Sequence, residues 1–103
     1  MTVTASWDGP SSGLTFRVAL DTHSVDLDGY DLRELAVLRS ERGGEVPPAR
    51  WDAPAGGHHR SGDLVFPDRL PDGTPVLAPG TRSLTLVVRE VGGVPERVFT
   101  WRW

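Results

Sequence analysis

The chain of 103 residues contains no cysteine, lysine, asparagine, glutamine or isoleucine. Without cysteine it has no disulfide, no thiol nucleophile and no thiolate metal ligand. Without lysine it has neither a Schiff-base catalyst nor the lysine of a phosphate-binding loop. A shortage of amide and thiol side chains with nine prolines predicts a thermostable protein. Codon bias in a GC-rich genome explains the same composition equally well.

Charge and hydropathy argue against two further classes, nucleic-acid-binding proteins and proteins with a membrane-spanning helix. All eleven basic residues are arginines scattered singly along a chain of net charge −3, so no basic stripe is available for nucleic acid. No apolar run approaches the ~18 residues that a membrane span requires. The segment Met1–Ser6 lacks the basic start and apolar run of a signal peptide. These features fit either a cytoplasmic protein or an exported one whose leader has been removed.

Apolar and polar residues alternate with a period of two over much of the chain, and helical periodicity is nearly absent. This alternation predicts strands with one buried face. Pro47 and Pro48 confine the strand that contains them to a sheet edge. Residues 32–38 are expected to form a strand, with one helical turn at 31–34. The other expected extended segments are 3–7, 14–20, 22–27, 45–51 (paired with 32–38), 62–67, 83–89 and 97–103, with a loop at 68–80.

Seven to eight short strands, with turn residues roughly every ten positions, predict an all-β fold. We expect residues 1–103 to form a single domain, an antiparallel β-sandwich of immunoglobulin-like type. A small closed β-barrel is the alternative. In the last strand Phe99, Trp101 and Trp103 are expected to share one face. Most of the eight aromatic side chains are expected in the core rather than in an exposed row for sugar or peptide binding.

The three histidines are the main candidate site. His58 and His59 are adjacent, and His23 follows the strand at 14–20. Neutral imidazole is a common ligand of zinc and copper, so we expect these three side chains to meet at a metal site. Asp21 or Asp52 would be a fourth ligand or would orient one ring through a hydrogen bond.

The alternative for the histidines is structural. Adjacent residues on a regular strand face opposite ways, so His58 and His59 can share an ion only where the backbone is irregular. Gly56 and Gly57 permit such a conformation. Otherwise one imidazole packs against Trp51 and bonds a loop carbonyl, while the other two face solvent.

Two further clusters are weaker candidates. Asp26, Asp28 and Asp31 surround a glycine turn and could bind calcium, but they lack the spacing of an EF-hand, and Asp is an ordinary turn residue. Ser24 and Ser61 lie near histidines in sequence, but neither lies in a Gly-x-Ser-x-Gly motif. The sequence therefore predicts no catalytic residue and no enzyme.

Four strings along the chain carry a family resemblance: Ala19-Leu-Asp-Thr-His-Ser24, Trp51-Asp-Ala-Pro-Ala-Gly-Gly-His-His-Arg60, Gly62-Asp-Leu-Val-Phe66 and Phe99-Thr-Trp101. Together they resemble an uncharacterised family of small bacterial domains with the pattern ALDTHS…W…GGHHR…G-x-L-x-F…F-x-W. The resemblance extends from about Leu14 to Trp101. It implies that His23, His58 and His59 belong to one feature. It also implies an extracytoplasmic protein, exported or tethered to a membrane.

These observations predict a non-enzymatic extracytoplasmic binding module, with copper or zinc held by His23, His58, His59 and Asp21. The alternative is a structural or protein-interaction β-sandwich, in which the histidines form a buried polar network and bind no metal. Neither hypothesis includes nucleic acid or membrane insertion.

Overall fold

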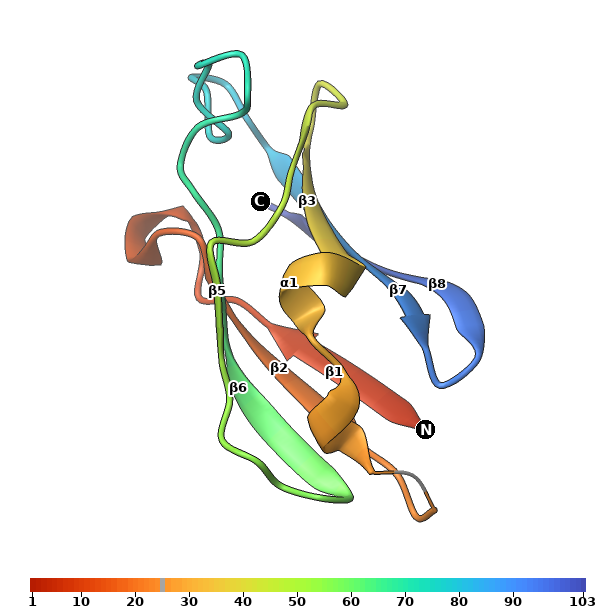
Figure 1. The fold of residues 1–103 in the computed structure, drawn as a ribbon. Coiled ribbons are helices and arrows are strands. Elements are labelled where there is room, and N and C mark those ends of the chain that lie inside the picture. Colours follow the sequence, from red (N-terminus) through yellow and green to blue (C-terminus); the bar gives the residue numbers. More distant parts are fainter. Residues whose placement is uncertain (25) are drawn as a thin grey trace.

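The computed structural model describes residues 1–24 and 26–103 and contains two antiparallel four-stranded sheets (Figure 1). The prediction of an all-β sandwich is confirmed, and the alternative of a closed barrel is wrong. The first sheet has the spatial order β1 (Thr2–Ser6), β2 (Thr15–Asp21), β6 (His59–Val65), β5 (Arg50–Asp52). The second has the order β4 (Glu45–Val46), β3 (Ala36–Ser40), β7 (Ser83–Val91), β8 (Val94–Arg102).

The strand order is that of an immunoglobulin-like sandwich. If β1 to β8 are lettered A, B, C, C′, D, E, F and G, the sheets read A-B-E-D and C′-C-F-G. Strands B and E are central in one sheet, and C and F in the other, as in that fold. Three short helical segments lie between strands: η1 (Pro10–Ser12), η2 (Leu27–Gly29) and α1 (Leu32–Leu35).

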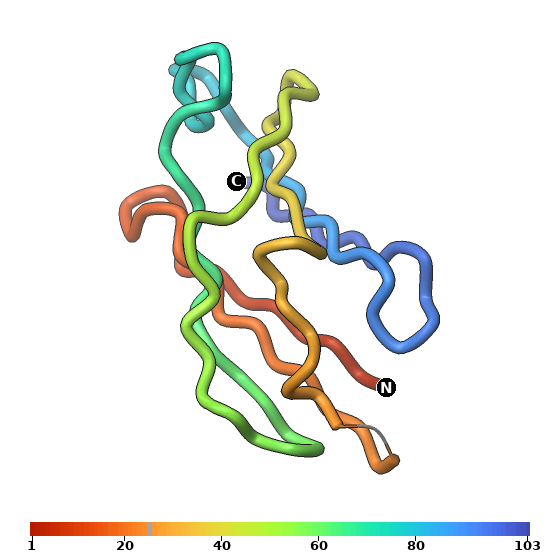
Figure 2. Tube along the Cα trace, viewed as in Figure 1, coloured from red at the N-terminus to blue at the C-terminus, as the bar shows by residue number. Residues whose placement is uncertain are grey.

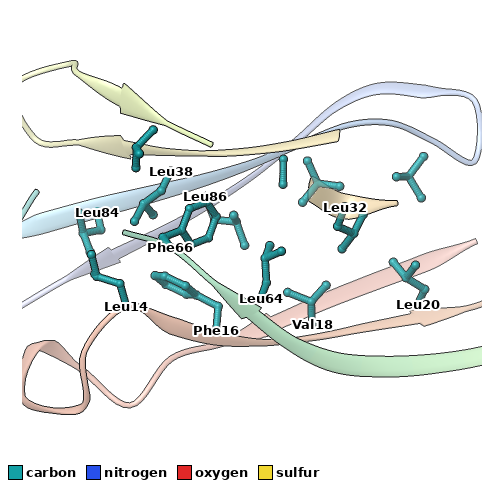
Figure 3. Close-up of a cluster of buried hydrophobic side chains, with 14 of the residues drawn as sticks. Leu14, Phe16, Val18, Leu20, Leu32, Leu38, Leu64, Phe66, Leu84 and Leu86 are labelled. Carbon is teal, nitrogen blue, oxygen red and sulfur yellow. The ribbon is translucent and has the colours of Figure 1, made fainter. Parts of the chain in front are cut away.

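The core fills the space between the sheets. The alternating residues of β2 and β7 face inward, as the sequence predicts, and Phe16, Val18, Leu84 and Leu86 are fully buried. Figure 3 shows these side chains pointing towards one another from the two sheets. Burial of such side chains, at roughly 25 cal/mol per Å² of apolar surface, is the main source of stability in a domain of this size.

The aromatic side chains follow the expectation in part. Phe16 and Phe66 are buried and meet edge to face, with ring centroids 5.6 Å apart. Trp7 stacks on Phe16 at 5.4 Å and contacts Trp103 at 5.3 Å. Trp103 is 39% exposed, so the aromatic cluster reaches from the core to the surface.

The predicted extended segment 22–27 is wrong for its described residues, and the predicted segment 45–51 is only partly right. Within the predicted segment 22–27, Val25 lies outside the described residues, residues 23 and 24 form a bend, and Leu27 begins η2. The segment 45–51 is divided between the two sheets, since β4 pairs with β3 whereas β5 pairs with β6. Pro47 and Pro48 separate them, because a residue without an N–H group cannot continue the ladder. The helical turn expected at 31–34 is present as α1, and the strand after it starts at Ala36.

Candidate functional site

The two loops that contain the histidines meet at one end of the sandwich (Figure 2). Asp21 lies opposite His59 in the β2–β6 ladder. Beyond the ladder, the amide of Thr22 donates to the carbonyl of His58 at 2.9 Å, and that of Leu27 donates to the carbonyl of Gly57 at 2.8 Å. The segment that follows β2 is thus joined by backbone hydrogen bonds to the segment that precedes β6.

A carboxylate strengthens this junction. One oxygen of Asp28 accepts hydrogen bonds from the amides of Gly56 at 2.9 Å and Gly57 at 3.3 Å. Gly57 has a φ of 63°, in the left-handed region that favours glycine. A Cβ atom at Gly56 would lie 2.0 Å from the carbonyl oxygen of His59, so only glycine fits there. The two glycines are therefore required for the loop's shape.

Arg60 is the central residue of the junction. Its guanidinium donates to carbonyls on both sides: Leu27 (3.3 Å), Asp28 (3.5 Å), Tyr30 (3.0 Å), Ala53 (3.1 Å) and Pro54 (3.3 Å). The planar fork of five N–H groups suits this arrangement, which a lysine ammonium could not reproduce. One half-buried side chain thereby fixes the segment 27–30 against the segment 53–54.

A cleft of about 340 Å³ opens beside Arg60. Its volume lies at the lower end of the range for small-ligand sites. The lining is polar and balanced in charge, with three aspartates and three arginines. These residues are Asp28, Asp31, Asp52, Arg33, Arg50 and Arg60, together with Tyr30, Ala49 and Trp51.

Two exposed ion pairs line the cleft. Arg33 contacts Asp31 at 2.9 Å, and Arg50 contacts Asp52 at 3.1 Å. The hydrogen bonds from the side chain and backbone of Arg33 lower the pKa of Asp31 below its usual value. Asp31 also caps α1 by accepting from the amide of Arg33. The cleft therefore presents two ion pairs, one at the start of α1 and one on β5.

Trp51 is, with Tyr30, one of two aromatic residues in the lining of the cleft. The guanidinium carbon of Arg60 lies 5.7 Å from the centroid of the Trp51 ring, within cation–π range. The indole Nε1 of Trp51 is buried and has no hydrogen-bond partner within the described part of the chain. A buried N–H without a protein partner is rare and costs about 1–3 kcal/mol unless a water or another bound group accepts from it.

The predicted metal ligands are only partly brought together. Nδ1 of His59 lies 2.8 Å from a carboxylate oxygen of Asp21, with the two side chains 72% and 46% exposed. His23 lies in the bend after β2 and His58 in the turn before β6, and both are exposed. Within residues 1–24 and 26–103, no three His, Asp or Glu side chains are grouped as a metal site would require.

Arg60, rather than a histidine, makes the partly buried polar contacts at this end of the sandwich. The side chains of His23, His58 and His59 are all exposed. Because side chains alternate along β6, His59 faces outward and Arg60 faces inward. The side chains of His59 and Arg60 therefore point to opposite faces of the first sheet.

The weaker candidates have local structural roles. Asp26 accepts from the amide of Asp28, Asp28 accepts from the two glycines, and Asp31 caps α1. Each aspartate thus bonds backbone, as turn residues do. The hydroxyl of Ser61 accepts from Arg17 at 3.2 Å.

Sequence reasoning missed Arg60 and the arginines of the cleft. Arg60 bonds backbone carbonyls, which every residue has, so no pattern of side chains in the sequence identifies its partners. The only available signal was its position after the glycine–histidine run that carries the family resemblance.

Comparison of the chain with protein-family models, with curated proteins and with solved structures finds no match. The resemblance to an uncharacterised bacterial family therefore stays a prediction. No helix among residues 1–24 and 26–103 has the length and apolar character needed to cross a membrane.

Proposed function

We propose that this domain is a non-enzymatic binding module whose ligand lies in the cleft beside Trp51 and Arg60. The observation that carries the proposal is a polar cleft of balanced charge that is lined by Trp51, with two of its carboxylates and two of its guanidinium groups held in ion pairs.

The lining favours a small neutral ligand with many hydroxyl groups, such as a sugar. Three carboxylates and three guanidinium groups cancel in formal charge, so neither an anion nor a cation gains from the cleft as a whole. Paired carboxylate and guanidinium groups offer acceptors and donors side by side, which hydroxyl groups can use together. The exposed part of the half-buried Trp51 side chain would offer apolar surface to the C–H side of a sugar ring.

Replacement of Trp51 tests the cleft. We expect the wild-type chain to bind a neutral oligosaccharide measurably in calorimetry, and Trp51→Leu to weaken that binding about tenfold, which is ~1.4 kcal/mol. Trp103→Leu is the matched control, because it removes an exposed tryptophan outside the cleft and should leave the affinity unchanged. Equal losses in both variants, or no binding by the wild type to any neutral sugar, would contradict the proposal.

A transition-metal site at His59 is the second candidate. Asp21 accepts from Nδ1 of His59 when that nitrogen carries the proton, and this leaves Nε2 free to bind zinc or copper. Metal-bound histidines commonly have such a carboxylate partner. His23 and His58 would complete the site, as the sequence predicts.

Metal titration distinguishes metal binding at His59 from ligand binding in the cleft. Calorimetry with Zn²⁺ and Cu²⁺ should give a dissociation constant below about 1 mM for the wild type. Binding should be lost in His59→Ala and weakened about 10- to 100-fold in Asp21→Asn. His23→Ala and His58→Ala, made singly, identify which of these two also binds. Bound metal should raise the melting midpoint. Equal affinity in the wild type and His59→Ala would exclude the site.

The family resemblance supports an extracytoplasmic location as part of the same proposal. The alternative function, a structural or protein-interaction sandwich, predicts that neither sugar nor metal changes the melting midpoint.

A further inference from the structure

Strand β8 forms a long free edge of the second sheet. It contains nine residues, from Val94 to Arg102, and within the described residues it pairs only with β7. Such an edge presents unpaired N–H and C=O groups that can pair with another strand, and proteins usually block it with charges, bulges or short strands. In β8 the segment Val98-Phe-Thr-Trp101 has no charged residue. The centre of this edge is therefore unprotected.

The exposed apolar side chains gather at the same edge. Only three large hydrophobic residues in the described chain are exposed: Met1 at 38%, Val98 at 54% and Trp103 at 39%. Val98 lies in the middle of β8, and Trp103 directly follows it. Across the outer face of the sheet Val98 pairs with Val87, which pairs in turn with Val37, so Val98 ends a row of valines at the free edge.

We infer that the domain forms a homodimer through antiparallel pairing of β8 with β8 of a second copy. A two-fold axis at Phe99 places Glu96 of each copy opposite Arg102 of the other, and Val98 opposite Thr100. Both cross-strand pairs lie on the outer face, where Glu96, Val98, Thr100 and Arg102 are exposed. Opposite charges at directly paired positions stabilise a ladder, and so does a pair of β-branched side chains such as Val98 and Thr100. Glu96 already pairs with Arg89 of its own chain at 3.4 Å, so Arg102 of the other copy would join this pair, and this match selects the register among the possible two-fold pairings.

The surroundings of β8 are compatible with a close approach. Strand β1 forms the same edge of the facing sheet, since Arg97 bonds the carbonyl of Met1 and Trp7 contacts Trp101. Its exposed side chains are Thr2, Thr4 and Ser6, which carry no charge. The cleft lies beside β5, at the opposite edge of the first sheet, so the dimer leaves it accessible. The inference is therefore independent of the proposed ligand.

Sedimentation equilibrium of the full chain from about 10 µM to about 1 mM tests the dimer. We expect a monomer–dimer equilibrium whose dissociation constant rises at least tenfold in Val98→Lys and in Arg102→Glu, because each places like or unpaired charges across the new ladder. Thr15→Lys is the control, since it adds the same charge on an exposed position of β2 and should leave the equilibrium unchanged. Circular dichroism of each variant verifies that it is folded.

Cross-linking tests the register. Because the chain has no cysteine, introduced thiols are the only ones present. An oxidised mixture of the Val98→Cys and Thr100→Cys chains should form mainly the mixed disulfide, since those two positions are opposite each other. A wild type that stays monomeric up to about 1 mM would overturn the inference. A dimer that is unaffected by Val98→Lys and Arg102→Glu, or that gives no preference for the mixed disulfide, would also overturn it.

Discussion

Replacing Arg60 with methionine is expected to lower the free energy of unfolding by about 2–3 kcal/mol. The guanidinium is the common donor to five backbone carbonyls on two segments that are far apart in sequence. Methionine keeps much of the apolar stem but donates no hydrogen bond, so partly buried carbonyls lose their partner. Urea denaturation monitored by tryptophan fluorescence measures the loss.

Two controls separate the geometry of Arg60 from its charge. Arg17→Met removes an arginine from the neighbouring strand β2, where its side chain is 56% exposed and pairs with the exposed Asp63. This change should cost less than about 0.5 kcal/mol. Arg60→Lys keeps the charge but cannot bond both segments, and it should lose most of what Arg60→Met loses. If Arg60→Lys is as stable as the wild type, the carbonyl contacts do not hold the loops.

Gly62→Ala is expected to cost about 3 kcal/mol, although it adds a single methyl group. Gly62 is buried in the middle of β6, on the inward face between Arg60 and Leu64. A Cβ atom there would lie 2.2 Å from the carbonyl oxygen of Asp52 and 2.5 Å from Cβ of Ala53. The segment after β5 must then move away from β6, which also displaces Trp51 and opens the cleft.

Gly29→Ala is the control for this substitution. A Cβ atom at Gly29 would meet no other atom within 4 Å, and its φ is not positive. The change should alter the unfolding free energy by less than about 0.5 kcal/mol. The thermal midpoint of Gly62→Ala should fall by roughly 10 °C or more relative to both wild type and Gly29→Ala. Equal midpoints for the two variants would contradict the close packing of the segment 52–53 on β6.

The sandwich could be predicted because its strands alternate regularly. The sequence predicts one inward face for the alternating apolar residues at 14–20, and all four of them are buried in the fold: Leu14, Phe16, Val18 and Leu20. Only Leu14 lies outside strand β2. The division of residues 45–51 between two sheets could not be predicted in the same way. Pro47 and Pro48 indicate that pairing is interrupted, but the partner of the residues beyond them depends on packing across the whole domain.

The candidate site was predicted less well than the fold. The segments that contain the histidines do lie together, since the amides of Thr22 and Leu27 bond the segment 57–58, but the expected meeting of three imidazoles at a metal ion stays a prediction. Which side chains the junction uses depends on the inward or outward direction of single residues along β6. The register of β6 turns His59 towards Asp21 and Arg60 into the junction, and a shift of one residue would exchange them.

The indole N–H signals of the four tryptophans give the most direct test that the cleft beside Trp51 is the ligand site. In a ¹H–¹⁵N correlation spectrum, with the Trp51 signal assigned from Trp51→Phe, neutral oligosaccharides should shift the Trp51 resonance. The Trp7 resonance should stay in place, because Trp7 does not line the cleft. Its Nε1 donates to the carbonyl of Gly13 at a distance of 2.8 Å. A panel of sugars that shifts Trp7 or Trp103 but not Trp51, or that shifts no indole signal, would contradict the account.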